Sequence, residues 1–299
     1  MSETSNDEFT ELLDGLVPGP TLQWTIGGVE VTRVGEWIVP TPREMLVPDI
    51  TDQQLLDNSG WLEPYFVRDL LLLSFHAFVV KSEGCTIVVD TCLGDAPVRM
   101  VPGNPDFLDR LAAEVDGGLD GVDVVLCTHL HFDHVGWNTR LIGGERVPTF
   151  GNARYLFGRD EVDHLASEED DMAIEELDIR PVIDAGLADL IDTRHTITSE
   201  VRTVPTIGHT PGHVSVLIES QGERALITGD VVHTPLQIRH PELPALFDWD
   251  VEQSTTTRRD VVEQYADSGA LVLGTHFAPP TAGHIRRSDD GVWFESSGT

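Results

Sequence analysis

The residues best suited to chemistry stand together in one short segment, His129-Leu130-His131-Phe132-Asp133-His134. Three histidines and an aspartate this close together are costly to bury, because neutral imidazoles need hydrogen-bond partners and protonated imidazoles repel one another. A metal ion resolves both problems, since neutral imidazole and carboxylate are common ligands of Zn²⁺ and similar ions. A surface histidine cluster without a metal is the weaker interpretation. The segment therefore predicts a metal site.

Three later segments carry a histidine or an aspartate where a predicted strand meets a turn that contains glycine. They are Gly208–His213 (GHTPGH), Leu226–Asp230 (LITGD) and Leu273–His276 (LGTH). A single residue in such a place is more often structural than functional. Because several such places occur in a chain that also carries HLHFDH, we expect their side chains to complete the same metal site.

The apolar pattern predicts an order of strands and helices around these segments. Runs of β-branched and aromatic residues indicate strands, and apolar residues at helical spacing indicate helices. The predicted strands cover residues 29–39, 70–80, 86–90, 123–128, 154–157, 201–205, 214–219, 225–229 and 271–275, and the predicted helices cover residues 106–115, 160–166 and 252–267. Strand groups broken by helices, in two halves of similar size, predict two facing sheets with helices outside.

Composition changes along the chain predict its organisation. Residues 1–24 are predicted as an N-terminal arm, because the polar start ends in Val-Pro-Gly-Pro, and residues 25–299 as a single domain without an internal linker. Residues 40–65 are rich in proline and predict a flap or a short-helix insertion. The acidic run at 168–178 predicts a solvated helix or loop face rather than a cation site.

The charge excludes whole classes of partner. The chain of 299 residues has 19 Lys+Arg against 51 Asp+Glu, a formal net charge of −32. Such an acidic protein repels nucleic acid and anionic membranes, and a small molecule is therefore the expected partner. A homodimer is a possible assembly. Its 3 cysteines form no CxxC pair, and its start lacks the order of a signal peptide. We expect a soluble, cytoplasmic protein.

The motifs together resemble those of the metallo-β-lactamase superfamily, over roughly residues 25–285. They occur in that family's order: Asp90 in VVDTCLG, then HLHFDH, GHTPGH with His213, TGD with Asp230, and GTH with His276. The resemblance implies an α/β fold, an αββα sandwich of two mixed β-sheets with helices on the outer faces. It also implies a site for two metals at one edge of the sandwich.

The resemblance further implies which residues bind metal. It assigns the first ion to His129, His131 and His213, the second ion to Asp133, His134 and His276, a bridging role to Asp230, and an orienting role behind the ligands to Asp90. His209, in the same segment as His213, is interpreted as a loop residue that bonds the backbone. The expected cofactors are two divalent ions, with Zn²⁺ favoured and Fe, Mn or Co as alternatives.

Within the superfamily, HLHFDHVGWN together with GDVVHTPLQ looks most like the N-acyl-homoserine lactonase and methyl parathion hydrolase group. Where the lactonases place a tyrosine, three residues after the bridging aspartate, this chain has His233. The resemblance implies a hydrolase of small neutral esters or lactones that uses a hydroxide held between two ions. Asp133, as a proton carrier, and His233, as a donor to the substrate, are the predicted catalytic residues.

Other functions stay open at this point. A phosphotriester hydrolase on the same scaffold, a mononuclear iron dioxygenase of the persulfide type and a non-catalytic metal-stabilised binding protein are the alternatives. Apolar residues near the motifs form either the core or the wall of a substrate pocket: Phe132, Trp137, Leu236, Phe247 and Trp249. If they line the pocket, they favour a substrate with an apolar body.

Overall fold

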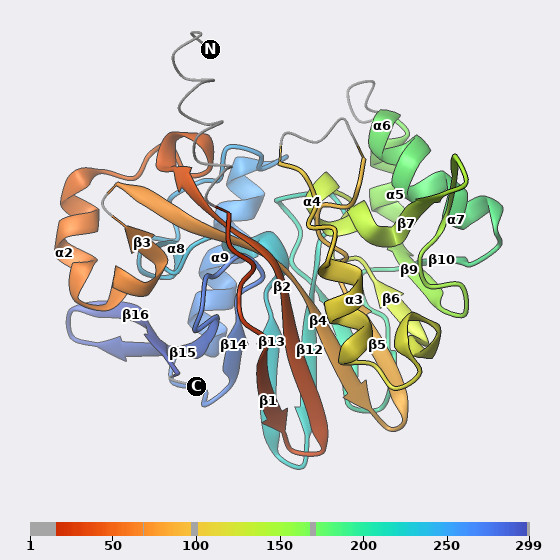
Figure 1. Ribbon diagram of the computed structural model, residues 1–299. Coiled ribbons are helices and arrows are strands. Elements are labelled where there is room, and N and C mark those ends of the chain that lie inside the picture. The colour runs from red at the N-terminus through yellow and green to blue at the C-terminus, as the bar shows by residue number, and fades with distance from the viewer. Residues whose placement is uncertain (1–15, 68, 97–100, 168–171, 298–299) are drawn as a thin grey trace, which may run out of the picture.

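Two β-sheets lie face to face in the computed structural model, and helices cover both outer faces (Figure 1). The structure describes residues 16–67, 69–96, 101–167 and 172–297. Apart from one separate hairpin, the strands from Leu22 to Ile191 build one sheet and those from Val201 to Ser296 build the other. The predicted α/β class and αββα sandwich are therefore confirmed.

The first sheet is mixed. In spatial order it holds β1 (Leu22–Ile26), β2 (Val29–Pro42), β4 (Leu70–Ser82), β5 (Cys85–Val89), β6 (Val124–Leu126), β9 (Arg154–Gly158) and β10 (Ala188–Ile191), with β3 (Phe66–Val67) paired to β4. The pairs from β1 to β5 are antiparallel, and the pairs from β5 to β10 are parallel. A separate hairpin consists of β7 (Thr139–Ile142) and β8 (Glu145–Pro148).

The second sheet is mixed as well. It holds β11 (Val201–Pro205), β12 (Val214–Ser220), β13 (Glu223–Ile227), β14 (Leu271–Leu273), β15 (Ala282–Ser288) and β16 (Gly291–Ser296). Only β13 and β14 pair in parallel among these strands, and the other pairs are antiparallel.

The helices divide between the two outer faces (Figure 1). Those beside the first sheet are α3 (Phe107–Ala113), α4 (Phe132–Val135), α5 (Arg159–Leu165), α6 (Met172–Ile174) and α7 (Arg180–Asp184), and those beside the second are α2 (Asp52–Leu62), α8 (Leu236–Arg239) and α9 (Val251–Tyr265). The short 3-10 helices are η1 (Arg43–Met45), η2 (Glu63–Tyr65), η3 (Gly118–Gly121), η4 (Gly136–Asn138) and η7 (Gly229–Val231), and η6 (Glu175–Ile179) is a π-helix between α6 and α7.

Strand β4 shows why the sheets pack on both faces. Phe78 and Val80 belong to the core between the sheets, where they join Val216 of β12, whereas Ala77 and Val79 belong to the core beneath the helices. Successive side chains of a strand point to opposite faces. A strand that is covered on both sides therefore needs the nearly continuous apolar run that this segment has.

The ligand-bearing segments gather at one edge of this sandwich because of the parallel pairs. The carboxyl ends of β5 and β6 open to the same edge, as do those of β13 and β14. Asp90 directly follows β5, and HLHFDH follows β6. Asp230 follows β13, and His276 follows β14. The fold thus brings together segments that are far apart in the sequence.

Each predicted strand and helix has a counterpart in the structure, with its ends shifted by a few residues. The strands β1, β3, β7, β8, β10, β15 and β16 were not predicted, because their sequences are short or polar. The stretch at 40–65 contains α2, whose first turn is capped by Thr51, so the short-helix interpretation is confirmed. Of the acidic run, residues 168–171 lie outside the described residues, and Asp178 is buried, contrary to the predicted solvated face.

The division into an arm of residues 1–24 and a domain of residues 25–299 stays a prediction. Residues 1–15 lie outside the described part, and β1 begins at Leu22. None of the helices in the described part of the chain has the length and apolar character to cross a bilayer.

Glu36 is a buried carboxyl at a β-bulge of β2, and it ties this strand to the ligand-bearing side of the fold. It accepts hydrogen bonds from the backbone N–H groups of Leu93 (2.8 Å) and Asn104 (3.0 Å). It also accepts one from the indole N–H of Trp137 (2.7 Å), which lies just after α4. Burial raises the pKa of Glu36 to about 7, and the hydrogen bonds offset this only in part.

This buried carboxyl makes stability depend on pH in a defined direction. Because its pKa is about 7 in the folded chain and 4.5 ordinarily, the folded state keeps a proton that the unfolded state loses. The unfolding free energy of the wild type, minus that of Glu36→Gln, should therefore fall by roughly 2–3 kcal/mol as the pH rises from about 5 to 8. Denaturant unfolding across this range measures it, with Glu145→Gln as a control for the loss of one surface charge. Parallel pH curves for wild type and Glu36→Gln would contradict it.

Candidate metal centre

Asp133, His134 and His276 come together from α4 and from the loop after β14. The Nε2 atom of His276 lies 3.3 Å from Nε2 of His134 and 3.5 Å from Oδ2 of Asp133. One ligand atom of each residue lies within 4.8 Å of those of the other two. The structure thus gathers the set that the sequence assigns to the second metal.

A second set consists of His129, His131 and His209. The Nδ1 atom of His131 lies 3.0 Å from Nε2 of His129 and 3.0 Å from Nε2 of His209. Nitrogens bound to one tetrahedral zinc ion at about 2.0–2.1 Å stand roughly 3.3 Å apart. Three ring nitrogens that face one another at nearly this spacing suit one such ion.

Asp230 lies between the two sets. Its Oδ2 atom is 3.5 Å from Nε2 of His209 and 3.8 Å from Nε2 of His129. The same atom is 3.2 Å from Nε2 of His276, and Oδ1 is 3.4 Å from Nε2 of His134. The carboxylate is buried, so both of its oxygens face the histidines rather than solvent. This is the place that the sequence predicts for a bridging ligand.

The structure corrects the choice between the two histidines of GHTPGH. His213, the predicted ligand, has both ring nitrogens occupied. Nδ1 bonds the carbonyl oxygen of Thr206 (3.0 Å), so Nε2 keeps the lone pair, and this lone pair accepts the backbone N–H of Asp230 (2.8 Å). His213 therefore has no lone pair left for a metal in this arrangement, and its ring holds the backbone of Asp230 instead.

His209 was expected to bond the backbone, and that prediction is wrong. Its Nδ1 atom lies 3.0 Å from Oδ1 of Asp248, a buried carboxylate. Nδ1 therefore carries the proton that bonds Asp248, and the lone pair of Nε2 faces His131. A histidine that donates to a carboxylate on one side and offers a lone pair on the other is the usual arrangement of a metal ligand.

Asp90 stands behind the ligands, as the sequence predicts. Its carboxylate accepts hydrogen bonds from the backbone N–H (2.7 Å) and the hydroxyl (2.9 Å) of Thr128, and it contacts Nδ1 of His134 at 2.9 Å. Asp90 itself adopts a positive φ of 58°, which is uncommon for a residue other than glycine. The contact turns the Nε2 atom of His134 toward the cluster.

The charges of the cluster suit cations. Burial lowers the pKa of His129 and His131, so these rings are neutral and keep lone pairs. Burial also lowers the pKa of His134, but nearby carboxylates, led by Asp230, outweigh it and raise that pKa well above its ordinary value. The carboxylates thus attract positive charge into the site. Divalent ions would supply that charge and displace the protons, so the donor set fits two metals.

His233 completes the polar part of the site. Its Nε2 atom lies 3.1 Å from Oδ2 of Asp230, and its ring stacks on that of His276 with centroids 5.7 Å apart. Burial lowers the pKa of His233, so the ring is neutral. His233 therefore lies beside the ligands, where the sequence predicts a catalytic donor.

The cluster forms the floor of a cavity of about 500 Å³. Its wall is mostly apolar and consists of Val39, Thr41, Met45, Leu46, Leu73, Phe75, Val101, Phe132, Ile174 and Phe247. The pocket prediction is thus confirmed for Phe132 and Phe247. Trp137 and Leu236 are instead buried in the core, and Trp249 lies outside the wall with 53% of its surface exposed.

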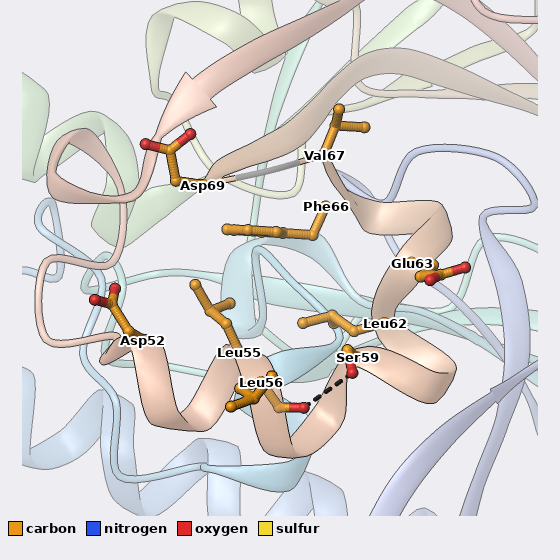
Figure 2. Close-up of a pocket in the computed structure, with 9 residues that line it drawn as sticks. All are labelled: Asp52, Leu55, Leu56, Ser59, Leu62, Glu63, Phe66, Val67 and Asp69. Atoms are coloured by element: carbon orange, nitrogen blue, oxygen red, sulfur yellow. Dashed lines mark hydrogen bonds between the residues drawn. The ribbon is translucent and has the colours of Figure 1, made fainter.

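A second hollow, of about 570 Å³, lies on the outer surface between α2 and β3 (Figure 2). It is lined by Asp52, Leu55, Leu56, Ser59, Leu62, Glu63, Phe66, Val67 and Asp69. Its described residues supply apolar side chains and three separate carboxylates but no histidine or cysteine. It has none of the converging groups that chemistry requires, so the cavity above the histidines is the candidate site.

Sequence reasoning missed Glu161, which holds two ligand segments together. This buried residue of α5 accepts hydrogen bonds from the backbone N–H of Leu130 (3.0 Å) and from that of Gly212 (2.6 Å). Leu130 belongs to HLHFDH and Gly212 to GHTPGH. A glutamate on a mostly polar helix gives no sequence signal for such a role.

Replacing Glu161 by alanine should loosen both segments, because two buried N–H donors lose their acceptor. Metal affinity should fall about 10–100-fold, as for other groups that orient metal ligands. Competition with a chelator measures it. Asp163→Ala, which removes an exposed carboxylate from the same helix, is the matched control. Equal affinities in the two variants would show that the segments keep their places without Glu161.

Comparisons with known proteins place this arrangement in a family. The family model described as the metallo-beta-lactamase superfamily matches residues 75–267. An N-acyl homoserine lactonase of a Bacillus species is 24% identical over 220 residues, which cover 68% of this chain and 82% of that relative.

Solved structures share the fold over nearly the whole chain. A hydrolase named AbOPH, described as belonging to the beta lactamase superfamily, has a TM-score of 0.78 at 23% identity and covers 95% of this chain and 99% of its own. AidC, described as a dizinc quorum-quenching lactonase, has a TM-score of 0.78 at 19% identity and covers 94% of this chain and 98% of its own. Since the family match spans more than half of its residues, this chain belongs to the metallo-beta-lactamase superfamily and is a metal-dependent hydrolase.

Proposed function

We propose that this chain hydrolyses small neutral esters or lactones with two divalent metal ions, of which zinc is favoured over iron, manganese or cobalt. The observation that carries the proposal is the position of Asp230 between two sets of ligand atoms, at the floor of a largely apolar cavity. A relative named as an N-acyl homoserine lactonase and a structure described as a dizinc lactonase support it. The proposed unit is a single cytoplasmic domain of residues 25–299.

The proposed ligand sets follow the contacts rather than the first prediction. His129, His131 and His209 would hold one ion, Asp133, His134 and His276 would hold the other, and Asp230 would contact both. His209 takes the place predicted for His213, because only His209 has a nitrogen free for a metal.

Two residues would move or hold protons. Two divalent ions supply a bound water of lowered pKa and an electrophile for the substrate carbonyl. Asp133 lines the cavity, where its carboxylate can accept a proton from the attacking water and return it to the leaving oxygen. His233 also lines the cavity, and the N–H that its neutral ring directs at Oδ2 of Asp230 (3.1 Å) can be shared with a substrate oxygen.

The cavity favours a particular class of substrate. The described residues of its wall supply aliphatic and aromatic surface but no lysine or arginine, so an apolar body with one polar reacting group fits it. The formal net charge of −32 disfavours polyanions such as nucleotides. Small neutral molecules are therefore the proposed partners.

A substrate panel on protein of measured metal content tests this function. We expect two ions per chain, hydrolysis of neutral lactones or aryl esters, and loss of that activity when a chelator removes the metals. The panel should include a phosphotriester and a nucleotide phosphodiester. Faster turnover of the phosphodiester than of every neutral ester and lactone would overturn the proposal, as would one iron per chain together with oxygen uptake. Turnover of the phosphotriester alone would select the alternative hydrolase activity.

The donor role of His233 has a separate test. His233→Ala should lower kcat by about 10²–10⁴-fold, the usual worth of a positioned proton donor, while both metals stay bound. Asp230→Ala is the contrasting variant, because it removes a carboxylate between two sites and should lose metal and activity together. Unchanged kcat in His233→Ala at full metal content would remove His233 from the mechanism.

A further inference from the structure

The carboxylate that orients His209 is itself held by a buried arginine. Asp248 lies in the segment before α9, and its side chain and that of Arg258 are both 0% exposed. Its Oδ1 atom bonds His209 at 3.0 Å, and its Oδ2 atom accepts hydrogen bonds from Arg258 (3.2 Å) and from the backbone N–H of Ala245 (2.9 Å). Both oxygens of Asp248 therefore have fixed partners.

Arg258, on α9, also fastens the segment that carries Asp230. Its Nε–H donates to the carbonyl oxygen of Val231 at 2.8 Å, and Val231 directly follows Asp230. Its remaining N–H groups donate to the carbonyl oxygens of Leu243 (2.8 Å) and Pro241 (3.1 Å) and to the hydroxyl of Ser254 (3.0 Å). One guanidinium thus reaches two ligand segments, the first through Asp248 and the second directly.

Stability alone is a poor reason for this pair. Taking two charges out of water offsets much of their attraction, and apolar residues of similar volume often serve a fold as well. Neither residue lines the cavity, so neither contacts a substrate there. The pair instead fixes the positions of His209 and Asp230, because Asp248 bonds the His209 ring and Arg258 bonds the backbone just after Asp230.

We propose that Asp248 and Arg258 are positioning residues that hold His209 and Asp230 for metal binding. This inference rests on the proposed function, since it requires the two-metal centre. Asp248 acts through His209, so its effect belongs to the ion held by His129, His131 and His209. The ion held by Asp133, His134 and His276 has its own orienting carboxylate in Asp90.

Site-selective metal binding tests the proposal. The wild type, Asp248→Asn, Arg258→Met and Arg258→Lys are loaded with ¹¹³Cd²⁺, and both dissociation constants are measured by chelator competition alongside the ¹¹³Cd NMR spectrum. His209→Ala identifies the resonance of the ion that His209 binds. Leu111→Ala, a core substitution in α3 away from the ligands, controls for lost stability.

Asp248→Asn should raise the dissociation constant of the ion that His209 binds by about 10–100-fold and shift the resonance of that ion. The dissociation constant and the resonance of the other ion should stay unchanged. The metal affinity of Arg258→Lys, which retains the charge, should lie between that of the wild type and that of Arg258→Met. Leu111→Ala should lower the thermal midpoint and leave both dissociation constants unchanged.

Three results would overturn the positioning role. The first is wild-type metal affinity in Asp248→Asn, and the second is an equal loss of affinity for both ions in that variant. The third is an equal loss of metal affinity in Arg258→Met and Leu111→Ala. If Asp248→Asn does not fold, the metal affinity of Arg258→Lys is compared with those of the wild type and Leu111→Ala instead. A wild type that binds both ions yet hydrolyses nothing in the panel would sink the proposed function alone, whereas a wild type without metal affinity would overturn both.

Discussion

The rest of the site depends on one buried carboxylate, that of Asp230, whose negative charge must be balanced by its neighbours. Burial disfavours its charged form, yet the surrounding histidines, led by His134 and His276, hold its pKa well below the ordinary value. A buried negative charge is tolerated only where positive charge or donors surround it. The sandwich provides this by opening the ends of both sheets to one edge, where the segments that follow the strands supply the surrounding histidines.

The proposed ligands keep their places through a layer of hydrogen bonds to other carboxylates. Asp90 contacts His134, Glu161 bonds the backbone of two ligand loops, and Asp248 bonds His209. Each lies on a different element from the group that it orients. Loops alone would give ligand atoms too much freedom, so rigid partners behind them are what make loop residues suitable for metal binding.

Much of this could be read from the sequence, because the signals were local. Apolar runs fixed the inner strands, and HLHFDH stood alone as a cluster of ligand types. The choice between His209 and His213 could not be made locally, since both occupy one irregular loop without a period. It depends on Thr206 and Asp248, which bond one ring each. Likewise, residue type could not separate Trp137, which bonds Glu36 in the core, from a true pocket residue such as Phe132.

The negative surface and the apolar cavity act on different stages of the proposed reaction. A neutral ester or lactone is indifferent to the net charge of −32, so burial of its apolar body against the wall governs its entry. Hydrolysis then creates a carboxylate on the same molecule. That anion is repelled by the field of the whole protein, and the proposed metal ions oppose this repulsion. Asp248 and Arg258 neutralise each other, so the pair can orient His209 without adding net charge behind the reacting atoms.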